Sequence, residues 1–416
     1  MTYPTSEPSP NPTSPAPPEP DPSEKRAAKD DRWNAALRDI TSGNAAVAFF
    51  SVLLAVAVGS LLIMFTDEEV RDTFGYVFAR PGDFLSASWN AIWGAYTALF
   101  RGSIYNTRAE DFATGIRPLT ETCKFAGPLI VAGLGVGLAF RAALFNIGGR
   151  GQMLLAGAAA GWVGYQFEMP WPVHLTLAIL VGMAAGALWG GLVGLLKART
   201  GAHEVIVTIM LNYVAFYLVF YALAEQSLLQ APGSANPKSL PMKESAILPK
   251  LVGDRYNLHL GFLLALVAVA VVWWILNRSS LGFRIRAVGE NPAASRTAGI
   301  DVGRTYIVVM LISGGLVGLA GVNQVLGTVT SGITTDLDAG IGFDAITVAL
   351  LGRSKPIGIM WAGLLFGAFK AGGFAMQASQ GITVDIVLVV QSLIVLFIAA
   401  PALIRAIFRL PAREAQ

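Results

Sequence analysis

The sequence is poor in charged residues. Only 14% of its 416 residues are Asp, Glu, Lys or Arg, and 54% are hydrophobic, whereas soluble proteins carry about a quarter charged residues. A membrane-spanning helix needs about 20 apolar residues. Uncharged runs of roughly that length or longer recur between the charged residues, at 40–66, 125–140, 151–167, 169–196, 205–224, 256–277, 305–335 and 386–404. This scarcity of charge excludes an ordinary soluble domain.

Reactive and metal-binding groups are also scarce. The single cysteine, Cys123, excludes an intramolecular disulfide, and the three histidines are too scattered to suggest a metal cluster. The sequence has no Gly-x4-Gly-Lys-Ser/Thr nucleotide loop, no His-Glu-x-x-His and no serine elbow. We therefore predict that the chain is not an enzyme and holds no metal or cofactor of its own.

The basic residues lack the clustering that a nucleic-acid surface requires, so no nucleic-acid partner is expected. Residues 1–24 are rich in Pro, Ser, Thr and Glu, and residues 1–44 are predicted to be a disordered cytoplasmic tail. The first apolar run begins near residue 45 and is long enough to span a bilayer, which favours an uncleaved anchor over a secretory signal.

The uncharged runs predict an all-α fold, a polytopic transmembrane helical bundle occupying residues 45–410. Most Lys and Arg residues fall in alternate connections, which by the positive-inside rule places both termini in the cytoplasm. About ten membrane segments are expected, near 45–65, 125–140, 146–167, 173–196, 203–224, 259–276, 305–326, 343–352, 356–376 and 383–402.

One of these segments is too short to cross alone. Only eight residues separate Asp344 from Arg353. With 327–342, this segment predicts a broken or re-entrant helix, which is tolerated at membrane depth where protein or a cavity covers the freed backbone.

Two long connections are expected outside. Segment 66–120 contains an aromatic stretch, Phe84–Phe100, that favours an interfacial helix over a further span. The proline-rich loop 225–258 is a candidate part of a docking surface.

Glycine recurs every fourth residue at Gly182, Gly186, Gly190 and Gly194. Residues four apart share one helix face, so this face lacks side chains and lets another backbone approach closely. Packing within the chain is the preferred interpretation, and a subunit interface is the alternative.

Polar side chains within the apolar runs are the candidate lining of a path. Asn146 and Gln152 are predicted to bond either freed backbone groups or a polar solute. The remaining path candidates are Asn212, Asn323, Gln324 and Gln377. Two intramembrane charges, Lys370 and Asp385, are predicted to neutralise each other across neighbouring helices, with ion coupling as the alternative.

The connection 278–304 is predicted to be cytoplasmic and to contain a short helix. Asn291 is a good N-cap, Pro292 suits a first helical turn, and Gly299 suits a left-handed helix end. An ordinary capped loop, whose arginines only set the topology, is the alternative interpretation.

Four ordered motifs resemble permease subunits of binding-protein-dependent ABC importers, most closely the simple sugar and nucleoside branch. They are FNIGGRGQMLLAGAAAG (145–161), HEVIVTIMLNY (203–213), GENPAASRTAGID (289–301) and GFDAITVALLGRSKPIG (342–358), and the resemblance runs from about 120 to 402.

The resemblance implies that the short cytoplasmic helix couples to an ATP-binding subunit, which uses ATP and Mg. Carried over to this sequence, the coupling residues are Glu290, Asn291, Pro292, Ala294, Arg296, Gly299 and Ile300. Further implied partners are a second, different permease subunit and an extracytoplasmic substrate-binding lipoprotein, at a bacterial plasma membrane.

The resemblance favours a purine nucleoside as the substrate, with a simple sugar such as ribose as the alternative. Arg150 departs from the family pattern, which often has an acidic residue at this position, and leaves the substrate preference open. The alternative from another class is an ion-coupled secondary transporter that uses Lys370 and Asp385.

Overall fold

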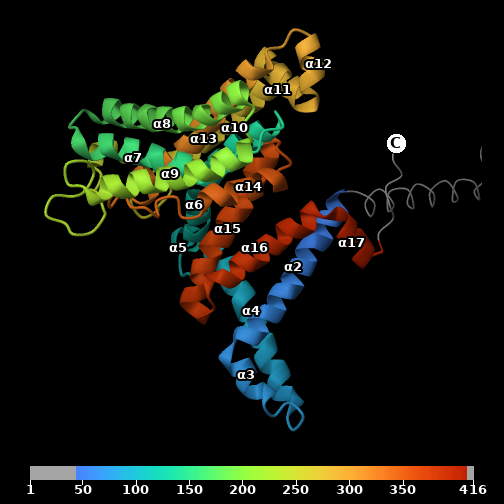
Figure 1. Ribbon diagram of the computed structural model, residues 1–416. Coiled ribbons are helices and arrows are strands. Elements are labelled where there is room, and N and C mark those ends of the chain that lie inside the picture. The colour runs from blue at the N-terminus through green and yellow to red at the C-terminus, as the bar shows by residue number, and fades with distance from the viewer. Residues whose placement is uncertain (1–43, 410–416) are drawn as a thin grey trace, which may run out of the picture.

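The computed structural model describes residues 44–409, so the predicted tail lies almost entirely outside the described residues. The described chain is helical and contains no strand apart from one isolated bridge between Lys250 and His259. The longer helices, drawn in Figure 1, are α2 (Asn44–Thr66), α4 (Pro81–Ser103), α6 (Arg117–Phe140), α7 (Gly149–Gln166), α8 (Trp171–Thr200), α9 (Glu204–Ala224), α10 (Leu260–Arg278), α13 (Val302–Asn323), α15 (Pro356–Gln380) and α16 (Val384–Ala399).

Shorter elements connect these helices. They are α3 (Glu68–Phe74), α5 (Phe112–Gly115), η1 (Glu244–Ala246), α11 (Ser280–Glu290), α12 (Pro292–Thr297), the π-helical turn η2 (Gln324–Thr328), α14 (Ile341–Leu351) and α17 (Pro401–Ile407). Within the described residues, seven helical segments are long and apolar enough to cross a membrane, and α14 and α16 are shorter apolar helices. The predicted polytopic helical bundle is confirmed.

Helices α6 and α13 form the centre of the bundle. They are the most buried of the spanning helices, because α8, α10, α14 and α15 surround them. Small residues allow the surrounding helices to approach closely. Gly133 of α6 lies against Val348 and Ile359, and Gly135 lies against Ser313. Lipid supplies no hydrophobic drive between helices, so this close packing is what holds the bundle together.

The glycine face of α8 packs on α13 of the same chain. A Cβ on Gly186 would lie 2.5 Å from the Gly314 carbonyl oxygen, and one on Gly190 would lie 2.5 Å from the Met310 carbonyl oxygen. The two backbones therefore touch, and the prediction of packing within the chain is confirmed.

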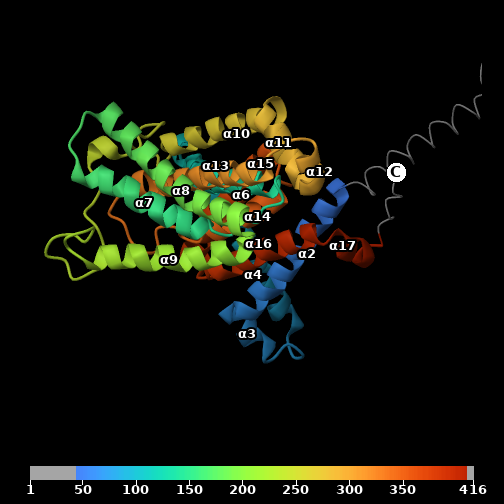
Figure 2. The ribbon, with the colours of Figure 1, turned by 45° about the horizontal axis from the view of Figure 1, so that its top comes forward.

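Both ends of the described chain lie at one end of the bundle. Figure 2 shows the start of α2, the helix α17 and the α11–α12 pair toward the same end, while the loop after α9 lies at the opposite end. Tracing the chain between these two ends gives ten passages, through α2, α6, α7, α8, α9, α10, α13, the segment 329–351, α15 and α16.

The eighth passage is broken. Residues 329–340 form no α-helix, and α14 begins only at Ile341. The non-helical part runs back along α7, since Ile333 contacts Gly161 and Leu337 contacts Gly157. Both Ile333 and Leu337 are buried, so protein covers the freed backbone as expected.

The helix predicted within Phe84–Phe100 is present as α4. Its buried residues Ala87, Ala91, Ala95 and Ala98 form one face, which packs against α15 and α2, and Trp89 and Trp93 stack on the exposed side. Its placement at the headgroup level stays a prediction.

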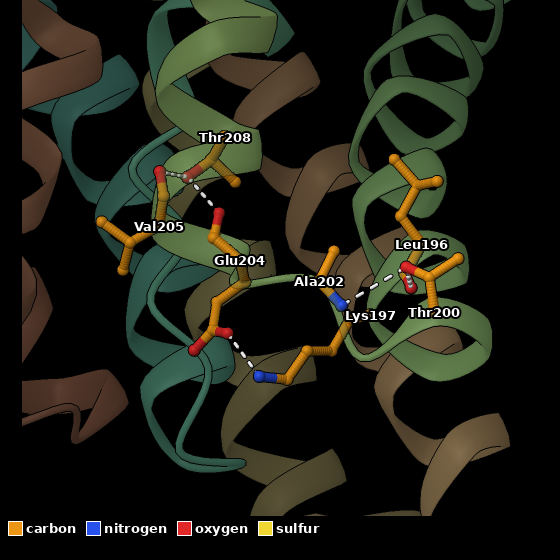
Figure 3. Close-up of polar contacts among 7 residues, drawn as sticks. All are labelled: Leu196, Lys197, Thr200, Ala202, Glu204, Val205 and Thr208. Atoms are coloured by element: carbon orange, nitrogen blue, oxygen red, sulfur yellow. Dashed lines mark hydrogen bonds and ion pairs between the residues drawn. The ribbon is translucent and has the colours of Figure 1, made fainter.

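The α8–α9 turn shows how neighbouring spans are joined. Gly201, at a φ of +69°, ends α8, and α9 starts three residues later. Lys197 Nζ lies 2.6 Å from Glu204 Oε2, and the Thr208 hydroxyl donates to the Glu204 carbonyl at 2.7 Å (Figure 3). The ion pair neutralises a buried carboxylate at the base of α9.

Candidate translocation path and coupling segment

Asn146 and Gln152 bind each other. The Asn146 amide nitrogen donates to Gln152 Oε1 at 3.1 Å, and the Gln152 amide nitrogen donates to Asn146 Oδ1 at 3.0 Å. Asn146 also donates to the Ser313 hydroxyl at 2.8 Å and accepts from the Gly148 backbone N–H at 3.1 Å. Both amide side chains are fully buried, and their bonds join the chain leading into α7 with the middle of α13.

Asn212 of α9 holds the start of α7 from the other side. Its Oδ1 accepts from the Gly151 backbone N–H at 2.8 Å, and its Nδ2 donates to the Ile147 carbonyl at 2.9 Å. Asn146 and Gln152 are predicted to bond either freed backbone groups or a polar solute. All of their described hydrogen bonds are to protein groups. A direct role of these three amides in the path stays a prediction.

The other three path candidates lie elsewhere. Asn323 and Gln324 lie where α13 passes into the π-helical turn η2. The buried Asn323 amide lies against Gly261 and Gly127 and has no hydrogen-bond partner within the part of the chain that the structure describes. Gln377 is exposed near the end of α15. The six candidates therefore fall in three separate places.

Lys370 does not pair with Asp385. Lys370 Nζ lies 3.3 Å from Asp344 Oδ2 and donates to the Ala339 carbonyl at 3.0 Å. Asp385 is exposed in the first turn of α16. The predicted pairing of these two charges is wrong, because the counter-ion of Lys370 comes from α14.

A second ion pair, missed at the sequence level, lies beside the broken passage. Arg150 Nε, in the first turn of α7, is 3.4 Å from Asp338 Oδ1, and the guanidinium lies over the Phe216 ring of α9 at 5.2 Å. Asp338 is only 4% exposed. The arginine of the first motif therefore neutralises a buried carboxylate in the non-helical segment.

The backbone between these two ion pairs is strained. Ala339 has a φ of +45° and Gly340 a φ of +77°, which are left-handed conformations in consecutive residues. Such strain persists only where the surroundings fix it, and it is typical of functional sites. Beside it lies a cavity of about 260 Å³ lined by Arg150, Asp336, Asp338, Ala339, Gly340 and Phe343.

Arg150→Gln is expected to destabilise the protein by about 3 kcal/mol, because it leaves the buried Asp338 carboxylate without its partner. The double variant Arg150→Gln/Asp338→Asn is expected to recover most of that loss. Thermal unfolding of the purified protein in detergent measures both effects. Equal melting temperatures for the single and double variants would contradict this pairing.

The predicted short helix is present as α12, at the end of the bundle that holds both ends of the described chain (Figure 2). Asn291 Oδ1 accepts from the backbone N–H groups of Ala293 and Ala294, both at 3.0 Å. Gly299 has a φ of +81°, and the Ile300 N–H donates to the Ser295 carbonyl at 2.9 Å. The expected N-cap, first-turn proline and left-handed end are all confirmed.

The segment is larger than predicted. Helix α11 precedes α12, and Glu290 is the last residue of α11. Ser279 caps α11 by accepting from the Gly282 N–H at 3.0 Å, and Gly289 lets α11 pack on the backbone after α6 at Arg141. Except for the buried Ser295, the residues of α12 lie partly or fully at the surface, including Arg296. Helix α12 is therefore an exposed helix that follows directly on the packed helix α11, and not an irregular loop.

Comparison with known proteins agrees with this architecture. A family model described as the permease component of the branched-chain amino acid transport system matches residues 119–399. The chain belongs to this permease family. No solved structure matches it. The matched range contains both the broken passage and α12, whereas α2 to α5 lie outside it.

Individual relatives cover most of the chain. It is 38% identical to the guanosine ABC transporter permease protein NupP of Bacillus subtilis, over 86% of this chain and 94% of that protein. It is 34% identical to the nucleoside ABC transporter permease protein NupB of Lactococcus lactis, over 77% and 86%. It is also 34% identical to the glucose ABC transporter permease protein TsgB13 of Haloferax volcanii, over 84% and 85%.

Proposed function

We propose that the chain is the membrane-spanning subunit of an ATP-driven importer of nucleosides, with purine nucleosides favoured. The observation that carries this proposal is the 38% identity along nearly the whole length of a guanosine permease. The membrane bundle and the capped α12 are the two parts that such a subunit requires.

ATP hydrolysis is assigned to a separate subunit, since the sequence has no nucleotide loop. That subunit can shift the permease between outward and inward access only if it contacts the two states differently. Helix α12 is the proposed contact, because it is exposed and joined through α11 to the end of α10 and directly to the start of α13. This assignment places both ends of the described chain in the cytoplasm.

A sugar permease is the second candidate, favoured by the 34% identity to a glucose permease. The two candidates differ in which solute competes for uptake. Vesicles are prepared with this chain, its ATPase, its second permease subunit and its binding protein.

Radiolabelled guanosine is expected to accumulate in these vesicles with ATP, and unlabelled purine nucleosides are expected to compete at least about tenfold better than ribose or glucose. Uptake should persist when a protonophore collapses the proton gradient, which separates the importer from an ion-coupled carrier. Competition by free sugars alone would overturn the nucleoside assignment.

A further inference from the structure

Two helices begin inside the bundle rather than at its surface. Gly149, the first residue of α7, packs on the backbone of Gly342, near the start of α14. The other end of α14 reaches the end of α6, where Arg141 Nε donates to the Ser354 carbonyl at 2.9 Å. Helix α14 is roughly 16 Å long. The first residues of α7 and α14 therefore lie inside the bundle, at about the length of α14 from the end that α14 reaches.

The segment before each of these helices is non-helical, at 141–148 before α7 and at 329–340 before α14. Irregular backbone at membrane depth is tolerated where it is covered by protein or lines a cavity. In the first segment, Asn146 accepts from the Gly148 backbone N–H and Asn212 donates to the Ile147 carbonyl, while Asn212 also accepts from the Gly151 N–H in the first turn of α7. The second segment instead borders the cavity of about 260 Å³.

Three groups line this cavity: the aromatic ring of Phe343, the guanidinium of Arg150, which is a hydrogen-bond donor, and the carboxylate of Asp336, which is an acceptor. The Phe343 side chain is 51% exposed, and Asp336 is exposed. Among the described residues Arg150 Nε is buried without a hydrogen-bond partner, although its charge is paired with Asp338. Arg150–Asp338 and Lys370–Asp344 are two ion pairs, while Asp336 has no cation within ion-pair distance among the described residues.

These groups suit a heterocyclic base. An aromatic ring stacks on a base face, an arginine donates to ring acceptors, and a carboxylate accepts from N–H donors on the base edge. A cavity of about 260 Å³ is just below the usual range for drug-sized ligands, so it fits a base better than a whole nucleoside. The unpaired Asp336 disfavours an anionic nucleotide.

We propose that this cavity binds the base of the transported nucleoside, with the base face on Phe343 and its edge between Arg150 and Asp336. The inference rests on the proposed nucleoside import and deepens it by naming the recognition site. Arg150 thereby becomes part of base recognition as well as the partner of Asp338.

Photolabelling locates the base directly. The complex of this chain with its second permease subunit and ATPase, without binding protein, is illuminated with radiolabelled 8-azidoguanosine and digested. We expect label on peptides that contain Asp336–Phe343 or Phe216, with protection by guanosine but not by GMP or ribose. Label on peptides lining the separate cavity of about 1040 Å³ between α4, α6 and α15 would overturn the assignment.

Two variants test the named contacts without breaking a described ion pair. Phe343→Leu and Asp336→Asn are each expected to lower specific labelling about fivefold. Their matched controls are Phe65→Leu, an exposed phenylalanine of α2, and Asp254→Asn in the loop before α10. Both controls should label like the wild type.

The outcomes separate this inference from the proposed function. Nucleoside uptake by the wild type together with unchanged labelling in Phe343→Leu and Asp336→Asn overturns the base site alone. Absence of nucleoside uptake by the wild-type complex overturns both. Size-exclusion profiles identical to that of the wild type establish that each variant complex is assembled.

Discussion

Gly299→Val is expected to reduce ATP-driven uptake by more than tenfold while the protein still inserts and folds. Gly299 has a φ of +81° and closes α12 through the bond from the Ile300 N–H to the Ser295 carbonyl. A β-branched residue is strongly disfavoured in this conformation, so the end of α12 must rearrange. A Cβ at this position meets no atom within 4 Å, which confines the damage to the backbone of the coupling segment.

Gly253 provides a closely matched control. It has a φ of +83°, a Cβ added to it would likewise meet no atom within 4 Å, and it lies in the loop at the opposite end of the bundle. Gly253→Val should carry the same local strain with uptake within about twofold of the wild type. Uptake and ATP hydrolysis are measured together in vesicles, and Gly299→Val is expected to lose their coupling. Equal uptake by the two variants would contradict a coupling role for α12.

Most of the spanning helices and their order could be predicted from the sequence because lipid imposes a simple rule. A spanning helix must be long and free of charge, and α8 and α13 obey this rule over most of their length. The glycine face of α8 could also be predicted, because glycines spaced four residues apart lie on one face of a helix. Capping residues such as Asn291 act locally, so α12 was predictable too.

Contacts between helices were harder to predict. Lys370 lies ten residues before the end of α15, whereas Asp385 is the second residue of α16. At 1.5 Å per residue the two charges differ in depth by more than about 10 Å, so adjacency in the chain did not make them neighbours. Asp344 lies at the matching depth because α14 starts inside the bundle.

No pattern in the sequence indicated that Arg150 and Asp338 form an ion pair. Asp338 lies in a non-helical segment, where no periodicity relates it to α7, and nearly 190 residues separate the two. The left-handed φ of Ala339 was likewise hidden, because alanine rarely adopts it. The part of the site that departs from regular helix was therefore the part that the sequence alone could not predict.

Gly186→Leu is expected to remove nearly all folded protein from the membrane. A Cβ on Gly186 would lie 2.5 Å from the Gly314 carbonyl oxygen and 2.7 Å from the Gly318 Cα. Both neighbours are backbone, so no side chain can rotate away, and α8 must separate from α13 along the most extensive helix–helix contact in the described chain. Van der Waals contact is the main force holding membrane helices together, and this separation forfeits it.

Ala184→Leu is the matched control, because Ala184 lies half a turn away on the exposed side of the same helix. It adds the same side chain where lipid can accommodate it, so its yield and melting temperature should match those of the wild type. Fluorescence-detected size exclusion of detergent extracts measures the folded fraction, with at least a tenfold loss expected for Gly186→Leu. A normal monodisperse peak for that variant would show that α8 and α13 tolerate separation and that backbone contact does not hold the centre of the bundle.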